Sequence, residues 1–255
     1  MPPEWLETLV APFARADVMV VTGNTLPLEL DTKAQQLFEY YGGLGRGYAP
    51  IQADHAWFNF YRRRAAPTWE LGATANAAFR ASIFADPAIG MVDETLGAGS
   101  PTGCSEDTYV FYKVLRAGHT LVYEPNAYVW HRHRREMADL QNQLYNYSKG
   151  HVAYHLTTAI NDGDLRGLYD IFVRLPRWRF RQLKSQVKRG LTGRERYPFS
   201  LVYAETAGNL AAPYALWKSR RRVKRLGRSQ PYVPPEQRIS GAVTRGAERD
   251  SVAAG

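Results

Sequence analysis

The stretch that decides the fold is Ser105–His131, SEDTYVFYKVLRAGHTLVYEPNAYVWH. Its first part, residues 107–117, predicts a helix that ends at Gly118, the residue type favoured just after a helix C-terminus. Two short strands are then expected, at residues 120–123 and 127–130. A helix followed at once by strands indicates a mixed α/β fold.

The segments on the N-terminal side add further helices and another strand. The compact apolar run Val18–Thr22 predicts a buried strand that ends at Gly23-Asn24. The Gly-rich segment 42–47 lacks the spacing of a phosphate-binding loop, so a flexible loop is favoured over a phosphate cradle. Three helices are expected here, over residues 4–14, from Leu37 to Tyr41, and starting near Asn76.

Composition excludes several classes of protein. The 255 residues are 45% hydrophobic and 22% charged, which suits an ordered core. No apolar run approaches the ~18 residues of a conventional membrane span, and no secretory signal is expected at the N-terminus. The single cysteine, Cys104, excludes an intramolecular disulfide and is interpreted as a small core residue.

The net charge of +9 is distributed unevenly along the chain. Residues 1–130 carry 9 basic and 14 acidic side chains, whereas residues 131–255 carry the other 24 basic and 10 acidic ones. The second half is therefore expected to meet an anionic partner, such as a phospholipid, a nucleic acid or a diphosphate-bearing substrate.

Several segments of the first half follow one another in a specific order. They are Gly72–Arg80 (GATANAAFR), Val92–Gly99 (VDETLGAG), the pair Glu106-Asp107, and Tyr123–His131 (YEPNAYVWH). In order and spacing they resemble the C-terminal half of family 2 glycosyltransferases, which are inverting enzymes of the GT-A fold that use nucleotide-sugar donors. The resemblance covers roughly residues 3–135. It implies a partial GT-A domain that transfers a sugar to an acceptor hydroxyl on a polysaccharide or lipid-linked glycan, as in cell-envelope glycan synthesis.

The resemblance also implies roles for individual residues. Asp107 would be the base that deprotonates the acceptor hydroxyl, and Glu106 would orient the acceptor or Asp107. A helix N-terminus suits a carboxylate, because backbone N–H groups and the helix dipole stabilise its charge. The alternative is that both residues simply cap the helix. Donor or acceptor contacts are expected from the matched segments, at Gly72, Ala73, Asn76, Arg80, Asp93, Glu94 and Gly99.

A divalent metal, Mn²⁺ or Mg²⁺, is expected from the resemblance. His131 is the candidate ligand, with a structural histidine as the equal alternative, since one neutral imidazole cannot hold a hard cation alone. The family places an Asp-x-Asp metal motif at the end of a strand, and no expected strand of this chain ends in one. Pro2–Phe13 resembles the segment that follows that motif. The nucleotide-binding half is therefore expected to be missing. A rival interpretation is a non-catalytic remnant or partner subunit that binds only the acceptor or the membrane.

The chain is predicted to divide into three regions. Residues 1–135 would form the GT-A part, residues 136–228 a helical basic extension, and residues 229–255 a disordered tail. Helical patterns run from about Asp139 to Ile160. Aromatic and basic residues then interleave over Phe172–Lys184.

This interleaving predicts an interfacial helix, with aromatic side chains at the lipid headgroups and basic ones on lipid phosphates. The run Lys218–Arg225 adds a polybasic patch. The chain is thus expected at an anionic membrane, as a cytoplasmic protein peripheral to the inner face of the cell membrane. A solvated charged surface is the alternative. Nucleic-acid binding is a further rival, but no recognised motif supports it and no nucleic acid is expected.

Overall fold

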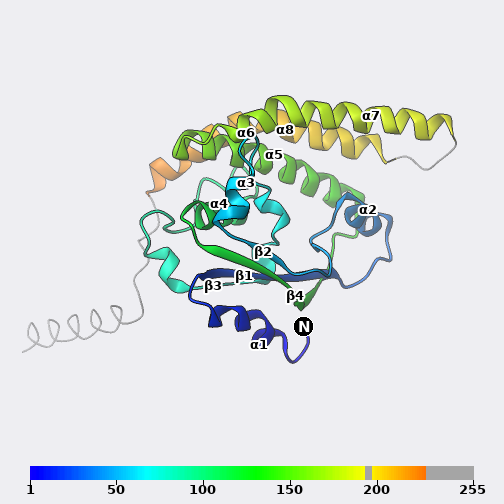
Figure 1. The fold of residues 1–255 in the computed structure, drawn as a ribbon. Helices are drawn as coiled ribbons and strands as arrows, with labels where there is room; N and C mark the ends of the chain where they lie inside the picture. Colours follow the sequence, from blue (N-terminus) through cyan, green and yellow to red (C-terminus); the bar gives the residue numbers. More distant parts are fainter. Residues whose placement is uncertain (193–196, 228–255) are drawn as a thin grey trace, which may run out of the picture.

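The computed structural model describes residues 1–192 and 197–227, and its centre is a four-stranded mixed sheet (Figure 1). The strand order is β2-β4-β1-β3. The central strands β1 and β4 run parallel, and each edge strand pairs antiparallel with its neighbour. The strands are β1 (Val18–Pro27), β2 (Ile51–Ala53), β3 (Ala77–Phe79) and β4 (Thr120–His131). The mixed α/β class predicted from the sequence is confirmed.

The two central strands are longer than expected. The prediction that the first strand ends at Gly23-Asn24 is wrong, and the two short strands predicted over 120–130 are one strand. The reason is a bulge: Gly23 pairs with Glu124 but Asn24 pairs with Tyr128, so β4 gains extra residues at this point. Pro125 lies among these residues, where no ladder hydrogen bond is required of it.

Asn76, which directly precedes β3, bonds the two central strands at the bulge. Its side-chain amide donates to the carbonyls of Asn24 and Ala127, both at 2.8 Å. The predicted helix from Asn76 is therefore wrong: a 3₁₀ turn, η3 (Thr74–Asn76), leads directly into β3. Gly23 is required here, because a Cβ would lie 2.0 Å from the Ala127 carbonyl oxygen.

Helices cover both faces of the sheet. Helix α1 (Trp5–Val10) and the 3₁₀ helix η1 (Ala11–Ala14) lie on one face, where Leu9 packs with Val18 and Val21 (Figure 1). The opposite face carries α4 (Glu106–Arg116) and α5 (Met137–Asp162). The remaining helices of the N-terminal part are α2 (Lys33–Tyr41), α3 (His55–Phe60), and the 3₁₀ helices η2 (Thr68–Glu70) and η4 (Ala81–Phe84).

The C-terminal helices share the core of the α/β part. Ala153 and Tyr154 of α5, and Leu216 of α8, pack in one cluster with residues of α4 and β1. Gly208 allows α8 to lie against α5, because a Cβ there would be 2.2 Å from the Tyr145 carbonyl oxygen. The elements are α6 (Arg166–Tyr169), the π-helical turn η5 (Asp170–Arg174), α7 (Leu175–Leu191) and α8 (Phe199–Leu226).

Helices α7 and α8 form the outermost layer above the sheet (Figure 1). The helix predicted from Asp139 is confirmed as α5. The predicted disordered tail, residues 229–255, lies outside the described residues. Within residues 1–192 and 197–227, no helix combines the length and the hydropathy needed to cross a membrane.

Candidate functional site

A cavity of about 1130 Å³ opens between the α/β part and helix α7. Four segments supply most of its lining: the Gly-rich loop 41–46, residues 69–75, the start of α4 at residues 103–108, and α7 with the preceding turn. Single residues of β4 and α8, three residues of α5, and Ala98 complete it. The structure thus brings five of the residues expected at a site into one cavity. They are Gly72, Ala73, Glu106, Asp107 and His131.

The start of α4 presents two adjacent carboxylates to this cavity. Ser105, with a φ of 86°, is the only non-glycine residue in the described part with a positive φ, and it turns the chain into the helix. One oxygen of Asp107 accepts from the backbone N–H of Thr108 at 2.7 Å. Among the described residues its other oxygen has no partner, so it can take a proton from a ligand.

Glu106 has a different environment from its neighbour. Burial raises the pKa of the Glu106 carboxyl, and the nearby charge of Asp107 raises it further. Its side chain lies against Gly97, where a Cβ would be 3.1 Å from the carboxyl carbon. Two neighbouring carboxyl groups in different environments can take different roles. The one with the raised pKa can donate a hydrogen bond, while the other accepts a proton.

At Gly72 the backbone of the segment 72–75 lies close to Thr22 of strand β1. Its φ is +111°, and a Cβ there would lie 2.6 Å from the Cβ of Thr22. The close approach keeps residues 72–75 flat against β1, so their backbone lines the cavity. The small residues Gly72, Ala73 and Ala75 allow this close approach.

Asn76 and Arg80, expected to bind a substrate, do not line the cavity. Asn76 is 2% exposed, and its side-chain oxygen accepts from the indole N–H of Trp5 at 2.9 Å in addition to the two bonds across the bulge. The Arg80 guanidinium donates to three backbone carbonyls, those of Phe13, Arg15 and Val18. The hydrogen bonds of both side chains thus serve the fold.

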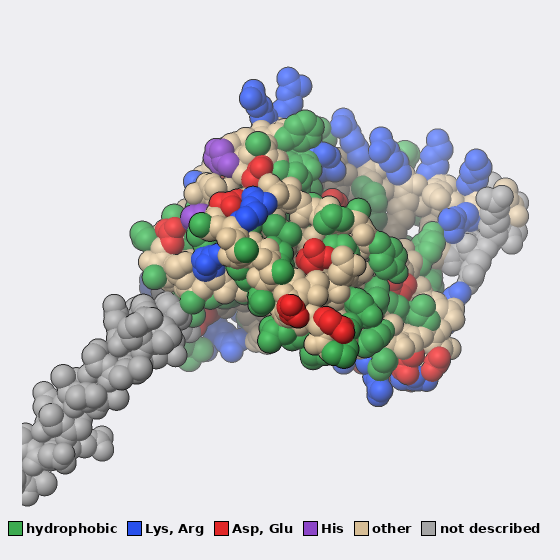
Figure 2. Space-filling view, turned by 60° about the horizontal axis from the view of Figure 1, so that its bottom comes forward, with side chains coloured by type: hydrophobic (Ala, Val, Ile, Leu, Met, Phe, Trp, Pro, Cys, Tyr) green, Lys and Arg blue, Asp and Glu red, His purple; other side chains and the backbone are tan. Residues whose placement is uncertain are grey.

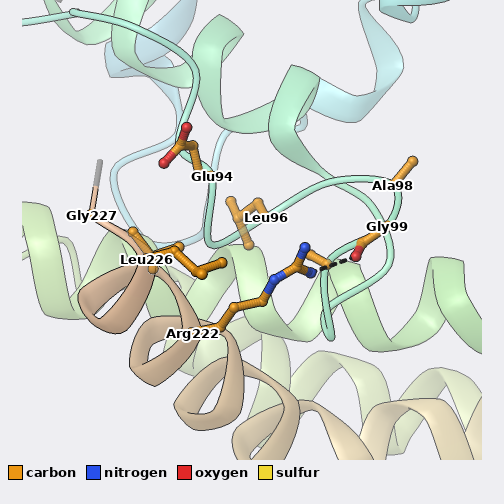
Figure 3. Close-up of a pocket in the computed structure, with 9 residues that line it drawn as sticks. Glu94, Leu96, Ala98, Gly99, Arg222, Leu226 and Gly227 are labelled. Atoms are coloured by element: carbon orange, nitrogen blue, oxygen red, sulfur yellow. Dashed lines mark hydrogen bonds between the residues drawn. The ribbon is translucent and has the colours of Figure 1, made fainter. Parts of the chain in front are cut away.

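Glu94 and Gly99 line a second, smaller cavity of about 580 Å³ at the end of α8 (Figure 3). Arg222 crosses it and donates to the Gly99 carbonyl at 2.7 Å. Asp93 makes a turn within its own loop, accepting from the Thr95 N–H at 2.8 Å. The segment 92–99 therefore faces α8, and these three residues are not brought together with Asp107.

His131 lines the large cavity but does not belong to a metal site in the described residues. Its Nδ1 lies 3.1 Å from Nδ1 of His133, whose Nε2 lies 2.7 Å from a Glu39 oxygen. Burial lowers the pKa of His131, and the neighbouring charges of His133 and Arg134 lower it further. Residues 1–192 and 197–227 contain no group of three or more His, Cys, Asp or Glu side chains placed to hold a metal ion. This donor set does not fit Mn²⁺ or Mg²⁺, which prefer several oxygen ligands.

Cys104 has a packing role beside the site. Burial raises the pKa of its thiol to about 12, so it is not a thiolate at neutral pH. Its sulfur lies against α5, where a Cβ on Gly150 would be only 2.3 Å away. Cys104 is partly exposed and lines the large cavity, so it is a small packing residue at the site and not a core residue.

The arginines that line the cavity were not among the residues expected at a site. Arg174, Arg177, Arg179 and Arg181 come from η5 and α7, and Arg46 comes from the Gly-rich loop. They were expected at a membrane or in a loop, because no sequence spacing relates them to Asp107. The sequence shows the interleaving of basic and aromatic residues, but only the position of α7 beside the cavity shows which of the arginines line it.

The chain was compared with protein-family models, curated proteins and solved structures. No family model, curated protein or solved structure matches it. The functional conclusion therefore depends on the geometry of the cavity and on the sequence motifs that line it.

Proposed function

We propose that the protein is an inverting glycosyltransferase of the GT-A, family 2 type. It would move a sugar from a nucleotide-sugar to an acceptor hydroxyl on a polysaccharide or lipid-linked glycan. The observation that carries this proposal is the position of Asp107. Its carboxylate, one oxygen of which has no partner among the described residues, faces a cavity large enough for a sugar at the start of an 11-residue helix.

The chemistry asked of this chain is general base catalysis. As the acceptor oxygen attacks the anomeric carbon, Asp107 takes the hydroxyl proton. The new carbon–oxygen bond forms on one face of the sugar while the bond to the nucleoside diphosphate breaks on the other, so the configuration inverts. The charge that develops leaves with the diphosphate. Glu106, with its raised pKa, orients the acceptor by a hydrogen bond.

The test is product formation by residues 1–255. Uridine, guanosine and thymidine diphosphate sugars are offered with Mn²⁺ and with acceptors of both expected kinds, and products are identified by mass spectrometry. A glycosylated acceptor supports the proposal. The proposal is contradicted if protein shown to be folded catalyses neither hydrolysis nor transfer in any of the combinations.

A second candidate function is a partner subunit that binds an acceptor but holds no donor. The lack of a metal-holding group in the described residues favours it, because a nucleoside diphosphate needs its charge neutralised. Calorimetry separates the two candidates. Micromolar, metal-dependent binding of a nucleotide-sugar supports the enzyme, whereas acceptor binding alone supports the subunit.

The proposal includes peripheral attachment to the inner face of the cell membrane. Exposed aromatic and aliphatic side chains on α7 lie beside basic ones, as in interfacial helices. The exposed apolar residues of this face are Phe180, Leu183 and Val187, and Phe172 of the preceding turn η5 is exposed as well. Figure 2 shows Lys and Arg side chains projecting along the edge that the C-terminal helices form.

A further inference from the structure

We infer that Arg177 and Arg181 form a binding site for a phosphate group carried by the acceptor. This inference rests on the proposed function and names the substrate class of the same cavity. Both arginines lie one helical turn apart on α7, on the side of the helix that lines the cavity.

These two guanidinium groups are available for a ligand, whereas the other arginines of the cavity are committed. Arg179 forms a buried ion pair with Glu205, and Arg174 pairs with Asp170 at 2.5 Å. Arg46 donates to backbone carbonyls of its own loop and of Trp69. Arg177 and Arg181 are exposed and have no ion-pair partner among the described residues.

The chemistry of two unpaired guanidinium groups points to phosphate. Each presents a planar fork of N–H donors that can bond two phosphate oxygens at once. The same cavity is lined by the carboxylates of Glu106 and Asp107, which repel an anion. A ligand that suits both sets of side chains has a neutral hydroxyl at Asp107 and an anionic group at α7.

The position of apolar residues on α7 indicates that this phosphate is borne by a lipid. At 100° per residue, Phe180, Leu183 and Val187 fall on one stripe of the helix, which borders the stripe of Arg177 and Arg181. All three are about half exposed or more, with Phe180 at 68%. A lipid chain can therefore lie along the apolar stripe while its phosphate reaches the cavity.

The other source of phosphate is the diphosphate of a nucleotide-sugar, and binding measurements distinguish the two. The full chain is titrated with farnesyl phosphate and with farnesol in the same detergent, and separately with uridine diphosphate and inorganic pyrophosphate. The variant is Arg177→Gln/Arg181→Gln. The control is Arg62→Gln/Arg63→Gln, which removes the same charge from exposed residues that line neither cavity.

We expect the wild type to bind farnesyl phosphate about 10- to 100-fold more tightly than farnesol, the effect of one or two charge-assisted hydrogen bonds. The Arg177/Arg181 variant should lose this preference and the control should keep it. The variant removes no ion pair formed within residues 1–192 and 197–227, so an unchanged thermal unfolding midpoint checks its fold.

Two results overturn the inference. One is an unchanged preference for farnesyl phosphate in the Arg177/Arg181 variant. The other is a loss confined to uridine diphosphate, which would assign the arginines to the donor. The proposed function can fail separately. If the protein transfers no sugar but its preference for farnesyl phosphate depends on both arginines, the phosphate site is supported and only the proposed glycosyltransferase activity is contradicted.

Discussion

Asn76 illustrates how one polar residue can have a structural role in a segment that looks catalytic. Its sequence context matches the donor- or acceptor-binding segment of the resembled family, yet its amide joins β1, β4 and the N-terminal helix. The three hydrogen bonds use nearly all of the capacity of one carboxamide. Asn76 and Gly72 belong to the same matched segment, which is why the resemblance placed both residues at a site.

Replacing Asn76 by Ala should therefore destabilise the fold. The change leaves two buried carbonyls and one indole N–H without partners, at roughly 1–3 kcal/mol for each unsatisfied group. We expect the free energy of unfolding in urea to fall by about 3 kcal/mol or more. The exposed Asn126→Ala is the matched control. An unfolding free energy near that of the wild type, with ligand binding lost, would show that Asn76 binds substrate after all.

Among the elements, helix α7 contributes to both features on which the proposals depend. It contributes arginines to the cavity on one side and apolar residues to the surface on another. One buried ion pair, between Arg179 of α7 and Glu205 of α8, links it to the rest of the protein. Glu205 is 0% exposed, and burial raises the pKa of its carboxyl.

Removing one member of this pair should loosen α7. In Glu205→Gln the Arg179 guanidinium remains at the buried position without its counter-ion, which typically costs roughly 3–5 kcal/mol. The double variant Arg179→Met/Glu205→Leu removes both charges and should be closer to the wild type. Urea unfolding of both proteins measures the difference. Equal stability of the single variant and the wild type would mean that the pair does not hold the helix.

The apolar stripe of α7 should drive association with anionic membranes. In vesicle sedimentation we expect strong binding to vesicles with anionic lipid and weak binding to neutral ones. Added salt should weaken the binding, because the field of the charged surface decays over a Debye length of ~8 Å at physiological ionic strength. Phe180→Ala should weaken binding without changing charge, because it removes apolar insertion. Phe60→Ala, which alters an equally exposed ring on α3, is the control. Binding of single-stranded nucleic acid but not of anionic vesicles would favour the nucleic-acid rival.

Across the whole molecule, the sequence predicted local elements well and their pairing poorly. The helices at Asp107 and Asp139 follow from local patterns, and both are present. The bulge opposite Gly23 could not be predicted, because it depends on contacts between β1, β4 and Asn76.

The candidate site was predictable only in part, because local patterns mark some of its residues while others come from distant segments of the chain. Glu106 and Asp107 are recognisable from their segment and do line the cavity. Arg177 and Arg181 join them only because α7 lines the same cavity as the start of α4, which lies about 70 residues back along the chain. No pattern within either segment indicates that the two share a cavity.

The most direct test of the account measures transfer by wild-type protein and by Asp107→Asn, with the anomeric configuration of the product read by NMR. We expect a product of inverted configuration from the wild type. The Asn side chain cannot accept the proton, so turnover should fall ~10²–10⁴-fold while acceptor binding changes little. Asp31→Asn, at an exposed carboxylate outside the cavity, should retain full turnover. Near-normal turnover of Asp107→Asn, or a product of retained configuration, would contradict the account.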